Sequence, residues 1–355
     1  MLRQDETVFV TGAAGFIGGR VVERLYLEKL ANVRAGIHRW SNVARIARFP
    51  IEMVKLDILD KNSLPRLMEG SNYVVHCAYG DKRTTVEGTE NVLRSALEIG
   101  IKRVVHLSTV EVYGNVSGYV DESSPLKYSG NVYADSKIDA EKICMEYHKK
   151  GLSIVILRPG IVYGPFSKLW TVRISQLILA GWGSVDGFDG ICNHVYVDDL
   201  VNAILLSLLT ESVDGECFNI TSSDPVTWSE FFARFHFTLD IPSLKPKSLF
   251  YAYIKAYMLE PLRWLGKQAM DAHRESVLKA TSRWLLLKKI ARYAEKQIRS
   301  TPSPKELKLY KRKVIYSIEK ARSLLKYSPQ FNLEKGLKLS AAWLKHHGFV
   351  PCKKK

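Results

Sequence analysis

Short apolar runs alternate with amphipathic stretches along the first half of the chain. Runs rich in β-branched and aromatic residues, typical of strands, occupy 7–11, 33–37, 52–56, 73–77, 103–108 and 153–157. Helical patterns occupy 62–69, 86–99 and 133–150, and another follows the first run, with apolar residues at Val21, Val22, Leu25 and Leu30. Strands that alternate with helices predict an α/β domain with a doubly wound parallel sheet, the Rossmann arrangement. The continuous apolar run 153–157 fits such a sheet, because its strands are buried on both faces.

The alternation fades after about residue 165 of the 355 in the chain. Residues 195–221 carry one more strand–helix–strand pattern, and the chain beyond 225 is mainly helical in pattern. We therefore expect a Rossmann domain made of 1–165 plus about 195–222. A smaller, mainly helical C-terminal substrate lobe is expected from 166–194 plus 223–355.

Charge divides the chain at about residue 241 into a near-neutral body and a strongly basic C-terminal third. The whole sequence has a formal net charge of +16, but residues 241–355 hold 27 Lys and Arg against 7 Asp and Glu. Residues 245–300 mix aromatic and aliphatic residues with these cations, as helices in a membrane interface do. The alternative is a helical lobe that packs its apolar stripe on the main domain. No nucleic-acid-binding module is recognised, so no nucleic-acid partner is expected.

The five cysteines form no CxxC pair, which suits a reducing cytoplasm rather than a disulfide framework. Asp5 and Glu6 stand where a signal peptide would have its apolar run. No stretch reaches the roughly 18 uninterrupted apolar residues of a spanning helix. We expect a cytoplasmic protein, with peripheral membrane contact through 245–300 as an open alternative.

A glycine-rich turn stands between the first predicted strand and the first predicted helix. Gly12, Gly15 and Gly18 follow the spacing GxxGxxG. Glycine permits a tight turn and lets the backbone approach a pyrophosphate, which the free N–H groups of the helix N-terminus then bind. This context predicts a dinucleotide site, although an ordinary glycine turn remains the alternative.

The end of the second predicted strand indicates which dinucleotide binds. An acidic residue about 20 positions past the turn normally holds the ribose 2′-hydroxyl, but here His38 and Arg39 stand there. A guanidinium can pair with a 2′-phosphate, so we expect NADP in preference to NAD, unless Arg39 is merely solvated. Asp57, directly after the run 52–56, is placed to accept a hydrogen bond from the adenine amino group.

Two further segments supply reactive groups. Tyr133 and Lys137 lie four residues apart in a helical pattern and therefore share one face. An ammonium beside a phenol lowers the pKa of that phenol and makes proton transfer accessible. Ser108 and Thr109 end an apolar strand, where a hydroxyl can bond the substrate oxygen that gains or loses the proton.

These motifs together resemble the extended short-chain dehydrogenase/reductase family, which includes nucleotide-sugar epimerases, dehydratases and 3β-hydroxysteroid dehydrogenases. The matching segments are TGAAGFIG (11–18), LDILD (56–60), VVHCA (74–78), STVEVYG (108–114), YADSK (133–137), RPGIVYGP (158–165), HVYVDDL (194–200) and RSLLKYSPQFNLEKGL (322–337). The resemblance leaves about 225–310 unmatched. It implies a homodimeric, NAD(P)-dependent enzyme.

The resemblance also implies roles for single residues. Thr109 would be the hydroxyl partner, Tyr133 the acid/base and Lys137 its electrostatic helper. The implied cofactor neighbours are Gly12, Gly15, Phe16, Ile17, Gly18, His38, Arg39, Asp57, Ile58, Cys77, Ala78, Tyr133, Lys137, Pro159 and Ile161.

The chain departs from the family after Thr109. Nucleotide-sugar dehydratases carry Asp-Glu there as the acid and base of water elimination, whereas this chain has Val110-Glu111. Dehydration of that kind lacks its proton donor, while Glu111 is a candidate catalytic carboxylate or a carboxylate bonded to nearby backbone. Asp198 and Asp199 fit no metal spacing, and His76 and His106 are expected to be satisfied core residues, so we expect no metal.

The sequence therefore predicts hydride transfer at a secondary alcohol or ketone, with a nucleotide sugar as substrate. One alternative is a hydroxysteroid-like or other lipid alcohol dehydrogenase at a membrane surface. The second alternative is a non-catalytic dinucleotide sensor, which the intact Thr109, Tyr133 and Lys137 disfavour.

Overall fold

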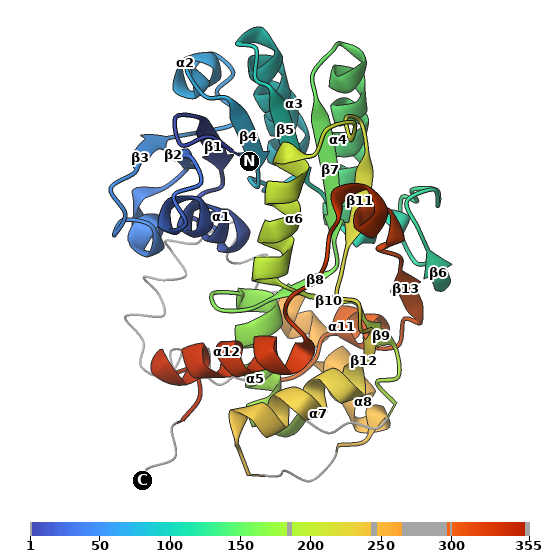
Figure 1. Ribbon diagram of the computed structural model, residues 1–355. Helices are drawn as coiled ribbons and strands as arrows, with labels where there is room; N and C mark the ends of the chain where they lie inside the picture. The colour runs from blue at the N-terminus through green and yellow to red at the C-terminus, as the bar shows by residue number, and fades with distance from the viewer. Residues whose placement is uncertain (1, 183–186, 243–246, 265–296, 299, 352–355) are drawn as a thin grey trace. The chain divides into compact units, whose positions relative to one another are not determined.

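The computed structural model describes residues 2–182, 187–242, 247–264, 297–298 and 300–351, which form two compact units (Figure 1). Unit 1 consists of 1–162, 193–223 and 315–332, and unit 2 of 163–192, 224–314 and 333–355. The division expected from the sequence differs mainly in the last part, because the structure returns 315–332 to unit 1. Of the basic stretch 245–300, residues 245–246, 265–296 and 299 lie outside the described residues.

Unit 1 is built on a seven-stranded sheet in the order β11-β7-β5-β4-β1-β2-β3. Its strands are β1 (Thr7–Thr11), β2 (Asn32–Ile37), β3 (Glu52–Lys55), β4 (Tyr73–His76), β5 (Arg103–Leu107), β7 (Ile154–Pro159) and β11 (Cys217–Ile220). All neighbouring strands in it run parallel. The doubly wound Rossmann fold predicted from the apolar runs is confirmed.

Helices cover both faces of this sheet. Those of unit 1 are α1 (Phe16–Leu27), η1 (Trp40–Arg45), α2 (Leu64–Met68), α3 (Lys82–Glu98), η2 (Val110–Tyr113), α4 (Val132–Lys149), α6 (Val197–Leu209) and η5 (Ala321–Leu325). In Figure 1, α1 and α6 lie side by side on one face, and α2, α3 and α4 lie on the other. The sequence predicted α3 from residue 86, but Asp81 caps it earlier by accepting a hydrogen bond from the Thr84 N–H at 2.7 Å.

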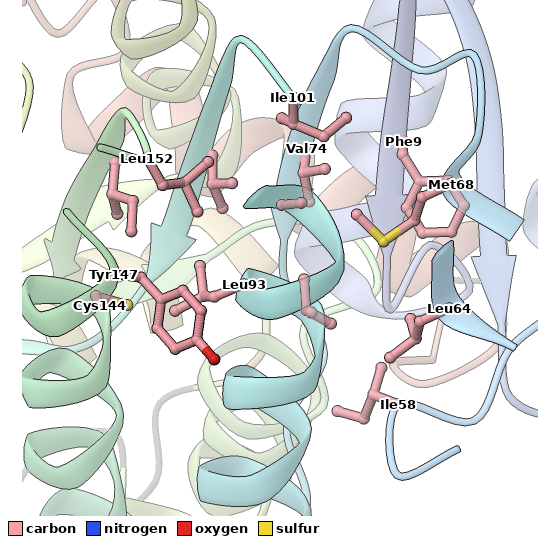
Figure 2. Close-up of a cluster of buried hydrophobic side chains, with 14 of the residues drawn as sticks. Phe9, Ile58, Leu64, Met68, Val74, Leu93, Ile101, Cys144, Tyr147 and Leu152 are labelled. Atoms are coloured by element: carbon pink, nitrogen blue, oxygen red, sulfur yellow. The ribbon is translucent and has the colours of Figure 1, made fainter. Parts of the chain in front are cut away.

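A single apolar layer joins the sheet to α2, α3 and α4 (Figure 2). Phe9 and Val74 come from central strands, Leu93 from α3 and Cys144 from α4, and each is fully buried. Alternate strand residues on the opposite face, such as Val75 and Val105, are equally buried. The central strands are therefore apolar on both faces, which holds the carboxyl edge of the sheet rigid beneath the candidate site.

A late segment completes unit 1. The strand β13 (Val314–Tyr316) pairs with β6 (Gly118–Val120), and the Ser317 N–H donates to the Val120 carbonyl at 2.8 Å. The ring of Tyr316 stacks on that of Tyr113 with centroids 5.7 Å apart. No local pattern predicted this pairing, since its two strands lie almost 200 residues apart in the chain.

Unit 2 is mainly helical, as the pattern beyond residue 225 predicted. Its helices are η3 (Lys168–Val172), α5 (Arg173–Leu177), η4 (Ile178–Trp182), α7 (Trp228–Leu239), α8 (Leu249–Met258), α11 (Pro304–Leu309) and α12 (Leu333–His346), with a strand pair of β9 (Ile191–Cys192) and β12 (Val226–Thr227). Two further short strands, β8 (Ile161–Tyr163) and β10 (His194–Tyr196), pair where the chain leaves unit 1 and returns to it. Trp228, Phe232 and Tyr310 form the aromatic centre of unit 2, and an ion pair between Arg173 and Glu306 ties α5 to α11.

Candidate active site at the carboxyl edge of the sheet

The sheet order changes direction between β1 and β4. From β1 the chain proceeds to β2 and β3 on one side, and from β4 to β5 and β7 on the other. Loops at the carboxyl ends of β1 and β4 therefore diverge, and such a switch point is where α/β proteins bind ligands. The glycine turn follows β1, while Cys77 and Ala78 follow β4.

The glycine turn is closed so tightly that side chains do not fit in it. Gly12 has a φ of +64°, and a Cβ there would lie 2.9 Å from the Ala78 nitrogen. A Cβ on Gly18 would overlap the carbonyl oxygen of Gly12. Both positions therefore require glycine, which leaves the backbone bare on the side where a pyrophosphate would approach.

The first helix begins directly at this turn. Gly15 is the N-cap of α1 and offers no side-chain cap, and the first turn contains no acidic residue. The N–H groups of Phe16 and Ile17 thus lie at the positive end of the helix dipole. A bare glycine cradle beside uncapped amides fits the diphosphate of NAD(P), so these residues would hold it.

The adenosine-side candidates follow β2 and β3. His38 and Arg39 are exposed directly after β2, and no carboxylate of the described ranges lies within ion-pair distance of Arg39. Asp57 is exposed two residues after β3 and accepts a hydrogen bond from the Leu59 N–H at 2.9 Å, whereas Ile58 is buried. These side chains belong to adjacent parallel strands and therefore lie at one edge.

The remaining cofactor candidates lie after β4 and β7. Ala78 donates its N–H to the Thr11 hydroxyl at 3.1 Å, which joins the two central loops. Cys77 is half-buried, and burial raises the pKa of its thiol to about 12, so it stays a neutral thiol. Pro159 ends β7 and Ile161 begins β8, and both are buried.

Thr109 and Tyr133 come together from different elements. Thr109 follows β5 and is buried, and Tyr133 lies in the first turn of α4, which Asn131 caps by accepting the Tyr133 N–H. The Thr109 hydroxyl lies beside that of Tyr133 and lowers the pKa of the phenol. Burial outweighs it, and together with the nearby Tyr79 and Glu111 raises that pKa to about 12. The residue is still 40% exposed, so its ring faces an opening while its hydroxyl lies in less polar surroundings.

Lys137 lies one turn further along α4 and is 3% exposed. Its ammonium donates to the Leu107 carbonyl oxygen at 2.6 Å, directly before the Ser108-Thr109 pair. Burial lowers its pKa to about 8, while Cys144, Cys77 and Glu141 act in the opposite direction. The shared helix face predicted for Tyr133 and Lys137 therefore points at the end of β5.

One contributor was missed by the sequence analysis. The ring of Tyr79 meets that of Tyr133 edge-on at 5.8 Å between centroids, and the Lys137 ammonium lies 5.8 Å from the Tyr79 centroid. Tyr79 is 62% exposed although it lies only three residues after the buried strand β4. An aromatic residue at the end of the VVHCA segment was the only available signal.

Two other candidates have divided roles. Ser108 was considered as a hydroxyl for the substrate oxygen, but its hydroxyl donates to Glu141, which lies on α4. Glu111 is half-buried, and its charge contributes to the raised pKa of Tyr133, so the carboxylate lies near the phenol. Its backbone N–H donates to the Thr109 hydroxyl at 3.2 Å.

The histidines and the aspartate pair have structural surroundings. His76 bonds Thr11 at 2.8 Å and Thr89 at 3.1 Å, as expected of a satisfied core residue. His106 departs from that expectation, because within the described ranges neither ring nitrogen has a hydrogen-bond partner.

Asp198 and Asp199 are engaged within unit 1. Asp198 accepts a hydrogen bond from Arg20 at 2.5 Å, and Asp199 accepts hydrogen bonds from the backbone N–H groups of Gln330 and Phe331 at 2.7 and 3.1 Å.

Within the described chain, no helix is both long and apolar enough to cross a bilayer.

Known proteins resemble this chain in sequence. It matches the profile of the NAD dependent epimerase/dehydratase family over residues 8–221. The UDP-N-acetyl-alpha-D-glucosaminuronate decarboxylase of Bacillus cytotoxicus is 30% identical over 257 residues, covering 64% of this chain and 78% of that protein. The 3beta-hydroxysteroid-dehydrogenase/decarboxylase isoform 1 of Arabidopsis thaliana is 23% identical over 366 residues, covering 93% and 77%.

Solved structures share the fold. The UDP-glucuronic acid 4-epimerase of Bacillus cereus, solved with UDP-glucuronic acid and NAD, superposes with a TM-score of 0.69 at 22% identity, covering 96% of this chain and 99% of the other. The dTDP-glucose 4,6-dehydratase of Streptomyces venezuelae gives 0.70 at 24% identity, covering 97% and 99%. Because the family profile spans more than half of the sequence, the chain belongs to the NAD-dependent epimerase/dehydratase family and is an enzyme of that type.

Proposed function

We propose that this enzyme transfers hydride between NAD(P) and a secondary alcohol or ketone of a nucleotide sugar. The observation that carries the proposal is the placement of the Thr109 hydroxyl beside that of Tyr133, with Lys137 one turn away, at the edge that bears the glycine turn. The relatives that act on UDP-sugars, including the UDP-glucose 4-epimerase of Vibrio cholerae at 24% identity, support this substrate class.

The residues divide the proton chemistry between them. In the oxidation direction, the Tyr133 oxygen takes the proton of the substrate hydroxyl as the hydride leaves the same carbon, and a ketone forms. Thr109 holds the substrate oxygen through a second hydrogen bond. NAD(P)⁺ supplies the hydride acceptor and a positive charge when bound. Tyr133 needs added positive charge, because its pKa of about 12 otherwise keeps the phenol protonated.

The residue after Thr109 narrows the reaction type. Val110 is buried and aliphatic, so it offers no proton to a leaving hydroxyl. We therefore assign the enzyme to epimerase, reductase or decarboxylase chemistry and not to water elimination. Glu111 is the carboxylate available beside Tyr133 for a second proton transfer.

The cofactor preference proposed is NADP over NAD. Arg39 is exposed after β2 without a carboxylate partner in the described residues, and its guanidinium suits a 2′-phosphate. Cofactor-induced shifts of the melting temperature provide the measurement. NADPH should stabilise the protein more than NADH at equal concentration, and the reverse order would contradict the preference.

Mass spectrometry of products tests the reaction itself. The full-length protein is incubated with NAD or NADP and a panel of UDP- and dTDP-sugars, with sterols as a second panel. Conversion of a nucleotide sugar by the wild type but not by Tyr133→Phe supports the proposal. Turnover of sterols alone would mean that the substrate is a lipid alcohol and not a nucleotide sugar. Cofactor binding without any turnover would favour a dinucleotide sensor.

A lipidic alcohol is the second candidate substrate because of the surface of α8. Phe250, Ile254, Tyr257 and Met258 form one exposed stripe on this helix, while Ala252 and Ala256 on the other face are fully buried. Trp264 follows, 61% exposed. Aromatic residues among cations suit the headgroup region of a bilayer, which supports peripheral membrane contact.

Flotation with anionic phosphatidylserine vesicles tests this contact. The wild type should float with the vesicles, and the pair of substitutions Phe250→Ser and Met258→Ser should abolish flotation. Leu27→Ser, at a residue 57% exposed on α1, is the matched control. Wild-type protein that stays at the bottom of the gradient would remove the membrane proposal.

A cytoplasmic homodimer completes the proposal. Free thiols occur at four cysteines, which suits a reducing compartment: Cys77, Cys144, Cys192 and Cys217.

The homodimer is carried over from the family resemblance. Sedimentation velocity at micromolar concentration should give about twice the monomer mass of 40.3 kDa, and a monomer would refute it.

A further inference from the structure

A buried ion pair lies directly behind the reactive edge. Arg158 on β7 and Glu141 on α4 are 4% and 3% exposed. The guanidinium donates from Nη2 to Glu141 Oε2 at 2.6 Å and from Nε to Oε1 at 3.0 Å, a forked geometry. Burial of two charges is costly, and a well-packed apolar pair is often as stable, so stability alone is a weak reason for it.

The pair holds the segment that carries Thr109 from both sides. Ser108, before Thr109, donates its hydroxyl to Glu141. At the other end of η2, Arg158 Nη1 donates to the Tyr113 hydroxyl at 2.9 Å. That hydroxyl donates in turn to the Asn219 side-chain carbonyl at 2.8 Å.

Helix α4 aligns this pair with the reactive groups. Tyr133, Lys137 and Glu141 are spaced four residues apart and therefore form one stripe. Each meets the end of β5 or the residues after it: Tyr133 lies beside Thr109, Lys137 bonds the Leu107 carbonyl and Glu141 bonds Ser108. The same helix face thus carries the acid/base, its cation and a carboxylate that holds the opposing strand end.

We infer that Glu141 is a positioning residue that fixes Thr109 and Glu111 against Tyr133, acting through Ser108 at one end and through Arg158 and Tyr113 at the other. The expected change in kcat rests on the proposed function. The expected ordering of residues 109–113 is a property of the fold and does not depend on that function. Arg158 has the same positioning role, because it bonds both Glu141 and the Tyr113 hydroxyl.

The test removes each arm and leaves the ion pair in place, because Glu141→Gln would strand a buried guanidinium and endanger folding. Ser108→Ala and Tyr113→Phe are made singly and together. Ser207→Ala is the matched control, since it removes an equally buried hydroxyl that bonds only within α6. Ser108→Thr keeps a hydroxyl at the first position.

Hydrogen–deuterium exchange of the full-length protein measures how well residues 110–113 are ordered, and it needs no substrate. Each arm variant should exchange the amides of residues 110–113 about tenfold faster, which corresponds to a local loss of about 1.4 kcal/mol. Peptides from β4 should stay unchanged, and so should the whole Ser207→Ala control. Unchanged exchange in both arm variants would overturn the inference, whether or not a substrate has been found.

Steady-state kinetics then separates positioning from mere stability. With a substrate that the wild type converts, Ser108→Ala should lower kcat about tenfold while KM and the cofactor Kd stay within about twofold. Ser108→Thr should recover most of that loss. A fall in kcat that merely follows the melting temperature, and that Ser207→Ala shares, would also overturn the inference. Absence of wild-type turnover would refute the proposed function alone, because the exchange experiment still decides this one.

Discussion

The glycine turn after β1 and the reactive edge after β5 lie at the same carboxyl edge of the sheet but depend on opposite features of the chain. At Gly12 and Gly18 the function depends on missing side chains, since a Cβ at either position would collide with backbone. At Thr109, Tyr133 and Lys137 it depends on particular polar atoms that other buried groups hold in place. The first region is a shape built from backbone, and the second is chemistry built from side chains.

This difference predicts how each region fails. A side chain added to the turn displaces backbone and should weaken binding of any dinucleotide. A polar atom removed from the reactive edge leaves the backbone unchanged and should lower the rate without weakening cofactor binding. The two regions can therefore be separated by measuring cofactor Kd and kcat on the same variants.

The largest effect is expected from Tyr133→Phe. The substitution removes the proton acceptor and keeps the ring that packs against Tyr79. kcat should fall by about 10³-fold, within the range of general acid–base catalysis, while the cofactor Kd stays within about threefold. Tyr128→Phe, on an exposed phenol that bonds Asp139, is the control and should keep its activity. Retained turnover in Tyr133→Phe would remove this residue from the chemistry.

Gly18→Ala should give the next largest effect, on binding. Its Cβ would overlap the Gly12 carbonyl oxygen, so the turn must open. The NAD(P)H Kd should rise about 100-fold by fluorescence titration, a loss of about 2.7 kcal/mol. Gly19→Ala is the neighbouring control, because its Cβ would lie 3.3 Å from the nearest atoms, the Ala13 carbonyl oxygen and the Arg45 side chain, and would overlap neither. Equal affinities in the two variants would show that the turn does not hold the diphosphate.

Arg39→Glu should change the choice between dinucleotides by a smaller factor. A carboxylate repels a 2′-phosphate and accepts a bond from a 2′-hydroxyl, so the ratio of NADP to NAD affinity should fall at least about tenfold. Lys149→Glu makes the same charge change at the last turn of α4 and should leave the ratio as it is. An unchanged ratio in Arg39→Glu would mean that the residue is only solvated.

The last prediction concerns acid stability, in the core that joins the two regions. Burial lowers the pKa of His76 to about 3 and that of His106 well below its usual range. The unfolded chain binds these protons below about pH 6.5 and the folded chain does not, so stability is full above pH 6.5 and falls as the pH drops toward 3. His76 should contribute about 1.4 kcal/mol per pH unit in that window, and His106 acts in the same direction.

Urea unfolding at pH 7 and pH 5 measures this contribution. His106→Leu should lose less stability between the two values than the wild type does. His346→Gln, on an exposed histidine at the end of α12, serves as the control. The same pH dependence in His106→Leu as in the wild type would contradict the proposed protonation.

Local pattern was sufficient for the sheet and for placing the segments that carry the candidate site residues. The buried strand β7 contains the continuous apolar run Ile154–Leu157, and the glycine turn and the Tyr133–Lys137 spacing are short-range signals. The structure adds what depends on contacts between distant segments. Ser108 looked like a second reactive hydroxyl, yet it serves Glu141, which lies 33 residues away. Tyr79 gave no pattern of its own, because a single exposed ring has no periodicity.

In the basic C-terminal third, residues 241–355, the sequence predicted less than the structure shows. Its composition drew attention to 245–300, but composition does not distinguish a packed helix from an exposed one. Only the accessible side chains of α8 reveal that Phe250 and Met258, 75% and 72% exposed, lie away from the protein interior. The second basic stretch of the sequence, around Leu278, Trp284, Leu285 and Lys289, lies outside the described residues.

The late return of 315–332 to unit 1 has a consequence for synthesis on the ribosome. Asp199 receives its backbone donors from Gln330 and Phe331, and Tyr113 receives its stacking partner from Tyr316. A nascent chain can form most strands of the Rossmann sheet early, but the Tyr316 contact forms only after residue 316 has emerged and the Asp199 contacts only after residue 331. Nascent chains stalled before residue 314 should present an accessible β6 edge to chaperones, and completion of the reactive segment would be one of the last steps of folding.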